Sequence, residues 1–142
     1  MVELSLTMAI MAVLAAIAIP RYAQAISSYR AKAAAQRLVN DLSYVQSVAR
    51  TTSSSRTITF TTDQYSIANM RDLETAASTY TVQLSAEPYN AKIASKSLTG
   101  GRLQIVFDGY GVPDCGGSFT LQAGNSSRIV TLDAATGRAT VQ

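Results

Sequence analysis

The chain has 142 residues, which is enough for one domain and an appendage but not for two full domains. It has a net charge of +3, one cysteine and no histidine, so it offers no imidazole for catalysis or metal binding and no intrachain disulfide. All of the net charge lies in the first fifty residues, where five basic residues oppose two acidic ones. The neutral remainder argues against a folded region built to bind phosphate.

The first twenty residues form an apolar run with a single charge, Glu3, and a proline at position 20. As a helix, the stretch 4–19 would span about 24 Å, slightly less than a hydrocarbon core of about 30 Å. Placing an ionised carboxylate in a membrane segment costs about 2.5 kcal/mol or more on insertion, so we expect Glu3 to have an interaction partner and a functional role. The alternatives are a plain membrane anchor or a signal peptide cut after residues 23–25, although a signal peptide carries Lys or Arg at its start.

Beyond Pro20 the sequence predicts a continuing helix, because apolar residues recur every three or four positions as one stripe. The stripe consists of Tyr22, Ile26, Tyr29, Ala33, Ala35, Leu38, Leu42, Val45 and Ala49. Pro20 removes one internal hydrogen bond and is expected to kink or loosen the helix without ending it. The hydroxyl-rich run 51–55 is expected to end it. A helix of about 80 Å would pack half of its length on a head and would need other copies of itself to cover the rest.

After residue 55 the hydrophobic period changes to two, as in strands with one buried face. We predict about seven short strands, at 57–61, 64–67, 79–84, 103–107, 118–122, 128–132 and 138–141, the last two joined by a turn at 133–137. The segment 70–77 fits either a loop or one helical turn. The predicted fold is α+β: a helical stalk in residues 1–54, with the apolar segment 1–20, packed on an antiparallel sheet or sandwich in residues 55–142.

The amino-terminal segment resembles that of type IV pilins and of the pseudopilins of type II secretion. The motif consists of Val2-Glu3-Leu4 and, at the family's separation, Ala15-Ala16-Ile17-Ala18-Ile19-Pro20-Arg21-Tyr22. The resemblance implies that two mature residues, a cleaved glycine and a basic leader precede Met1, with methylation of the processed terminus. It also implies that Glu3 pairs with the amine of a neighbouring subunit, where two buried opposite charges relieve each other's desolvation and fix the register.

Weaker motifs in the remaining chain resemble the H-type minor pseudopilin and its type IV pilus counterpart. They are the stalk motif Arg30 to Leu38, Ser47-Val48-Ala49-Arg50 near the end of the stalk, the strand Arg56 to Phe60, the motif Ile105 to Gly111 and the final hairpin Thr136-Gly137-Arg138. The resemblance implies a structural subunit of a type IV pilus-like filament. It would be inserted in the bacterial inner membrane, cleaved by a prepilin peptidase and assembled by an inner-membrane platform into a periplasmic or extracellular filament. Its partners would be copies of itself or related pilins. An abundant pilin and a minor, tip-located pseudopilin both stay open.

A small basic patch is a second candidate site, because Arg128 and Arg138 are expected to face each other across the last hairpin. Such a patch would fit the alternative of a membrane-tethered module that binds DNA or another ligand. Two exposed arginines on a neutral head are more often simply solvated, so we expect no nucleic acid partner. A DNA-binding module would also tolerate replacement of Glu3, whereas a filament subunit would not.

The remaining polar residues indicate no enzyme, cofactor or metal site. The sequence contains no nucleophile elbow, no candidate general base beside a nucleophile and no phosphate loop. Asp108 and Asp114 are interpreted as turn residues rather than calcium ligands. Cys115, in a Pro-Asp-Cys-Gly-Gly turn, is interpreted as a small, partly buried thiol, with a bond to another subunit as the alternative.

Overall fold

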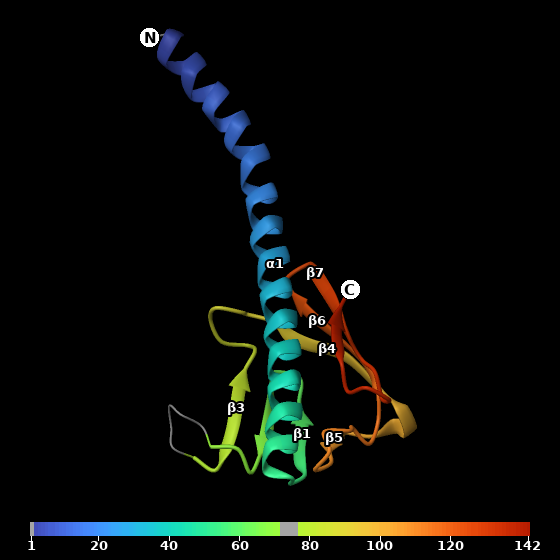
Figure 1. Cartoon of the computed structure of the whole chain (residues 1–142). Helices are drawn as coiled ribbons and strands as arrows, with labels where there is room; N and C mark the ends of the chain where they lie inside the picture. The colour runs from blue at the N-terminus through green and yellow to red at the C-terminus, as the bar shows by residue number, and fades with distance from the viewer. Residues whose placement is uncertain (1, 72–76) are drawn as a thin grey trace.

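A single long helix, α1 (Val2–Thr52), carries the rest of the chain on its C-terminal half (Figure 1). The structure is a computed structural model that describes residues 2–71 and 77–142. α1 continues through Pro20, as predicted, and its axis curves in the part that is clear of the strands. It ends at Thr52, where the hydroxyls of Thr51 and Thr52 donate to the Val48 carbonyl. The predicted end of the helix is confirmed.

The strands of the described residues form two four-stranded antiparallel sheets. The first sheet has the order β3–β2–β1–β5, with β1 (Arg56–Phe60), β2 (Gln64–Ala68), β3 (Thr79–Gln83) and β5 (Gln104–Phe107). The second has the order β4–β6–β7–β8, with β4 (Lys92–Leu98), β6 (Gly117–Ala123), β7 (Ser126–Leu132) and β8 (Ala139–Val141). A short 3₁₀ turn, η1 (Thr99–Gly101), links β4 to β5. The predicted α+β fold, a long helix on antiparallel strands, is confirmed.

One hydrophobic core joins the helix to both sheets. The helix contributes seven buried residues, Ala31, Ala34, Ala35, Leu38, Leu42, Val45 and Ala49. Between the sheets, the rings of Phe60 in β1 and Phe119 in β6 pack with their centroids 4.4 Å apart. The alanines let the strands approach the helix closely, and Leu38, Leu42 and Val45 add larger side chains to the same core.

The prediction of a single apolar stripe is wrong for its N-terminal part, which includes Tyr22 and Tyr29. Tyr22 and Tyr29 are 71% and 74% exposed, whereas the lower part, from Ala35 to Ala49, is buried as predicted. Tyr29 lies nine residues before Leu38, which is two and a half turns, so the two side chains project from opposite faces of α1. Steps of three and four residues hold from Tyr22 to Ala33 and from Ala35 to Ala49, but the step from Ala33 to Ala35 is two residues and moves the stripe to the opposite face of the helix.

Strand β4 was not predicted, because its sequence does not alternate. Ile93 and Leu98 are its buried residues, and they are five positions apart, which would place them on opposite faces of a regular strand. A β-bulge between Ile93 and Ser95 adds one residue and returns both side chains to the same face. The other strands lie close to their predicted positions. The segment 70–77 lies mostly outside the described residues, so its two alternatives are not distinguished.

Candidate assembly surface

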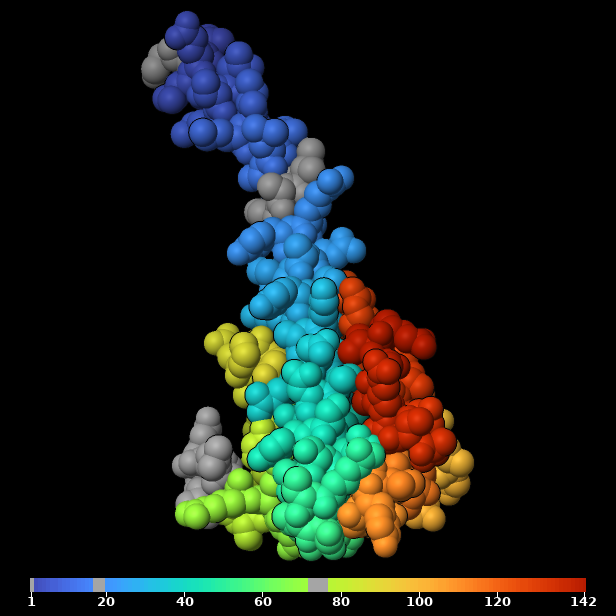
Figure 2. Space-filling view, in the orientation of Figure 1, coloured from blue at the N-terminus to red at the C-terminus, as the bar shows by residue number. Residues whose placement is uncertain are grey.

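The N-terminal half of α1 carries a surface that the rest of the chain leaves uncovered. We call the residues 2–16 and 20–25, all of which are exposed, the exposed stalk segment (Figure 2). Its large apolar side chains are Val2, Leu4, Leu6, Met8, Ile10, Met11, Val13, Leu14 and Tyr22. Contiguous apolar surface of this extent marks a site of contact with protein or membrane. Within the described residues, α1 is the helix long and apolar enough to cross a membrane.

Glu3 is exposed in the first turn of this segment. Its negative charge is favourable beside the partly positive N-terminal end of the helix. Among the residues that the structure describes, Glu3 has no cationic partner, since the ion pairs found there lie in the lower part of the molecule. A carboxylate in this position becomes costly as soon as the surrounding apolar surface is covered, and a cation from another chain would remove that cost.

Pro20 lies seventeen residues beyond Glu3 in the same exposed stalk segment. The helix continues on both sides of it, so its missing N–H weakens the helix locally without dividing it. The structure thus places both residues predicted to act in assembly on the uncovered half of α1, well apart along its axis. It shows their position and exposure; their role in assembly stays a prediction.

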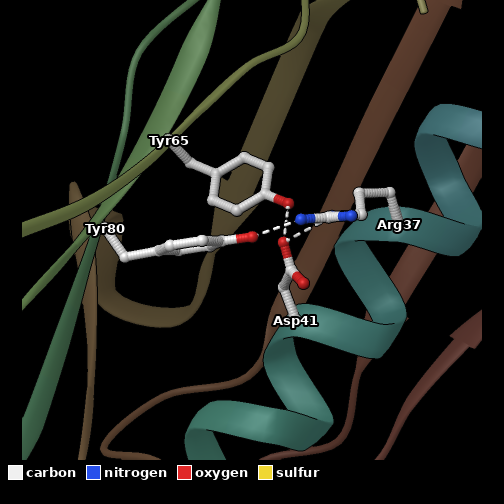
Figure 3. Close-up of polar contacts among 4 residues, drawn as sticks. All are labelled: Arg37, Asp41, Tyr65 and Tyr80. Atoms are coloured by element: carbon white, nitrogen blue, oxygen red, sulfur yellow. Dashed lines mark hydrogen bonds and ion pairs between the residues drawn. The ribbon is translucent and has the colours of Figure 1, made fainter. Parts of the chain in front are cut away.

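A polar cluster fixes the lower half of α1 to the first sheet (Figure 3). Asp41 is only 8% exposed, and its Oδ2 atom lies 3.1 Å from Nε of Arg37, one helical turn earlier. The hydroxyl of Tyr65 in β2 donates to the same oxygen, and Arg37 donates to the hydroxyl of Tyr80 in β3. We call these four residues the junction cluster. It satisfies a carboxylate that would be costly to bury alone.

Burial and charge in the junction cluster hold the Tyr65 phenol in its neutral form. Burial raises the pKa of Tyr65 above its ordinary value, and the negative charge of Asp41 adds to the effect. Burial by itself would lower the pKa of Arg37, but the Asp41 carboxylate and the Tyr80 hydroxyl outweigh it and raise that pKa. Arg37 therefore keeps its charge at every accessible pH.

The sequence carries one local signal for the junction cluster. Asp41 is adjacent to Leu42 and three residues after Leu38, so it borders the buried face of an apolar stripe. A carboxylate at such a position is rarely unpaired. Its partner Tyr65, however, is 24 residues away, and the contact between Arg37 and Tyr80 spans 43 residues. Neither pairing follows from local spacing.

Alkaline pH is expected to destabilise the fold. Burial, together with the neighbouring Asp114, raises the pKa of Cys115 to about 11, and the pKa of Tyr65 is also raised. The unfolded chain therefore loses these protons at lower pH than the folded chain, so the free energy of unfolding falls as the pH rises above about 9. Chemical denaturation from pH 7 to 11 measures this fall. Tyr65→Phe should remove part of it, and an unchanged slope in that variant would contradict the assignment.

The predicted basic patch is wrong in its geometry. Arg128 lies in β7 and Arg138 lies in the turn before β8, but the register pairs Leu132 with Ala139 and Ile129 with the C-terminal Gln142. The two arginines are therefore at opposite ends of the hairpin, about five residues or roughly 16 Å apart along it. Arg128 instead donates from Nη2 to the hydroxyl of Ser28 on α1, 3.3 Å away.

The two carboxylates weighed as metal ligands have partners within the fold. Asp108 accepts hydrogen bonds from the backbone N–H groups of Tyr110 and Val112, at 2.9 and 2.8 Å, and so closes its turn. Asp114 accepts from the N–H of Val106 at 2.9 Å and forms an ion pair with Arg102. Cys115 is buried and its thiol is free, which agrees with its interpretation as a packed residue.

These features define a class of protein. A long helix with an uncovered apolar N-terminal half, whose other half packs on antiparallel strands, is the architecture of pilins and pseudopilins. The sequence matches the family model of the type II transport protein GspH over residues 34–136, which is most of the chain, and the chain belongs to this family. The matched range does not include Glu3, Pro20 or Arg138.

The fold is similar to a crystal structure of the type IV minor pilin FimU of Pseudomonas aeruginosa. The TM-score is 0.53 at 15% sequence identity, and the similarity covers 79% of this chain and 87% of the other. At this identity the likeness concerns the fold. Comparison with curated protein sequences gives no match. Pilin and pseudopilin families consist of structural subunits rather than enzymes, and they assemble into filaments with related subunits. The chain is such a structural subunit.

Proposed function

We propose that this chain is a minor pseudopilin, located at or near the tip of a type II secretion filament, and that it enters the filament through the exposed stalk segment. The observation that carries the proposal is the division of α1. Its lower half buries one face in the core, and in its upper half the described side chains before Pro20 are exposed and mostly apolar, with Glu3 as the single charge. The family match and the weaker motifs of residues 56–138 support the minor role.

The chain acts in two parts in this proposal. Residues 1–54 are the stalk that packs against the stalks of neighbouring subunits, and residues 55–142 are the head that faces outward. The end of α1 at Thr52 and the start of β1 at Arg56 support this boundary. Glu3 fixes the axial position of the stalk by pairing with a cation of a neighbouring subunit. Pro20 lets the apolar segment bend relative to the head, which the curvature of α1 supports (Figure 1).

Before assembly the same apolar segment holds the subunit in the bacterial inner membrane. A prepilin peptidase and an inner-membrane assembly platform are the partners at this stage, and related pilins are the partners in the periplasmic or extracellular filament. The length and composition of α1 are compatible with this sequence of events. An apolar stretch of about 24 Å anchors less firmly than a full span of about 30 Å, which suits a subunit that must leave the bilayer.

The position of the subunit along the filament tests the minor role. A peptide tag added after Gln142, which is exposed, allows gold labelling of sheared filaments in the electron microscope. We expect label at one end of a filament and none along its length. Regular label along the length would show an abundant pilin and would overturn the minor role. A tag on the principal subunit of the same filament is the control for access of the antibody.

A further inference from the structure

The upper edge of the head and the adjacent turns of α1 form a basic surface directly below the apolar stretch that ends at Pro20. Arg21, Gln24, Ala25 and Ser28 line a shallow hollow of about 450 Å³ on one face of the helix. From the second sheet, Arg128 donates to the hydroxyl of Ser28 and so brings a second guanidinium to its lower end. We call these five residues the shoulder.

The shoulder is cationic, with few acids near it. No acidic residue occurs between Glu3 and Asp41, so the helical wall carries no carboxylate. In the described residues, neither Arg21 nor Arg128 forms an ion pair, since the pairs found there are Arg37 with Asp41 and Arg102 with Asp114. The loop between β3 and β4, which contains Glu87, lies on the other side of α1 from β7 (Figure 1).

The position of the shoulder along α1 sets it at a membrane surface when the stalk is inserted. Arg21 is the first charged residue after the apolar stretch and follows Pro20 directly. That stretch is about 6 Å shorter than the hydrocarbon core, so insertion draws its lower end toward the lipid and places Arg21 among the headgroups. Ser28 and its partner Arg128 lie two turns, or about 10 Å, further down, within reach of an arginine side chain.

We propose that the shoulder binds the phosphate groups of anionic lipids while the subunit waits in the membrane, so that Arg21 and Arg128 hold the head against the bilayer surface. The inference rests on the membrane stage of the proposed function. Lipid phosphate fits the shoulder because guanidinium groups bind phosphate in bidentate geometry, and because Gln24 and Ser28 add hydrogen-bonding groups between the two cations. Insertion alone brings lipid phosphates to this level, without requiring a second subunit.

The distance of the shoulder from the headgroups tests the proposal in the full-length chain. The chain is placed in nanodiscs of phosphatidylcholine alone or with phosphatidylglycerol, and a fluorophore is attached at Asn125→Cys in the turn between β6 and β7. Quenching by headgroup spin-labelled lipid reports docking of the shoulder. We expect stronger quenching with phosphatidylglycerol, with the docking equilibrium reduced about fivefold by either Arg21→Gln or Arg128→Gln.

Matched variants separate the possible outcomes. Arg138→Gln removes the same charge from the far end of the hairpin and should leave quenching unchanged, and Arg128→Lys should retain most of the lipid preference. Equal quenching in the two lipids, or an equal loss in Arg138→Gln, would overturn the proposal. Equal quenching together with loss of the arginine variants from filaments would assign the shoulder to a neighbouring subunit instead. A chain that fails to enter the discs at all would contradict the membrane stage of the proposed function.

Discussion

Replacing Glu3 with alanine is expected to keep the protein out of the filament while the head folds normally. Glu3 is the one charge on the exposed stalk segment above Pro20, and it makes no contact with the sheets, so its removal leaves the core intact. In a filament, truncating one member of a buried ion pair leaves the other charge unpaired, at a cost of about 3–5 kcal/mol. A loss of this size corresponds to at least a hundredfold lower incorporation.

The measurement compares the amount of protein in sheared filaments with the amount left in the membrane, by immunoblotting. Ser5→Ala is the matched control, because it removes a polar group two positions further along the same turn, where the hydroxyl donates only to the Val2 carbonyl. Resistance of the head to limited proteolysis checks the fold. Normal incorporation of Glu3→Ala would show that assembly does not need Glu3. It would favour a binding module whose helix serves only as a tether for the head.

The second large effect is expected at the junction cluster. Asp41→Ala removes the acceptor for the buried Tyr65 hydroxyl and the partner of Arg37. An unsatisfied buried hydroxyl costs about 1–3 kcal/mol. The side chain of Arg37 is 41% exposed and turns to water, so its lost ion pair adds less than about 1 kcal/mol. We therefore expect the free energy of unfolding to fall by about 2–3 kcal/mol.

Thermal and chemical unfolding of the detergent-solubilised full-length chain, followed by circular dichroism, measures this change. Asn40→Ala is the matched control, because Asn40 is the exposed neighbour of Asp41 on the same helix and bonds only to Gln36 one turn away. Tyr65→Phe should recover part of the loss in the Asp41→Ala background, since it removes the unsatisfied hydroxyl. If Asp41→Ala destabilised the protein no more than Asn40→Ala, the junction cluster would contribute nothing to the docking of α1.

The sequence predicted the long helix, its apolar half and most of the strands, because these follow from local composition and period. The incorrect predictions concern features that depend on three-dimensional packing rather than on the local sequence pattern. Tyr22 and Tyr29 belong to a run of three- and four-residue steps that ends at Ala33, and the two-residue step to Ala35 separates that run from the buried face of α1. Strand β4 was missed because the bulge between Ile93 and Ser95 breaks the period of two on which the prediction depended.

The candidate sites also divide into those that the local sequence identifies and those that depend on long-range contacts. Glu3 and Pro20 could be selected from the sequence, because a charge and a proline in an apolar run are unusual wherever the chain folds. The pairing of Arg128 with Arg138 requires a register five residues away from the true one, and the structure pairs Arg128 with Ser28 of α1 instead. The junction cluster depends on contacts over 24 and 43 residues, which only the packing of two sheets on one helix creates.

The central claim, that the exposed stalk segment becomes buried between subunits in the filament, is tested most directly by thiol accessibility in sheared filaments. Single cysteines at Leu14 in the stalk and at Ala86 in the head are both exposed in the isolated chain. The native thiol, Cys115, is buried and, with its raised pKa, should stay unreactive. We predict that maleimide labels Ala86→Cys in intact filaments but labels Leu14→Cys only after detergent dissociates them. Equal labelling of both positions in intact filaments would contradict assembly through the stalk.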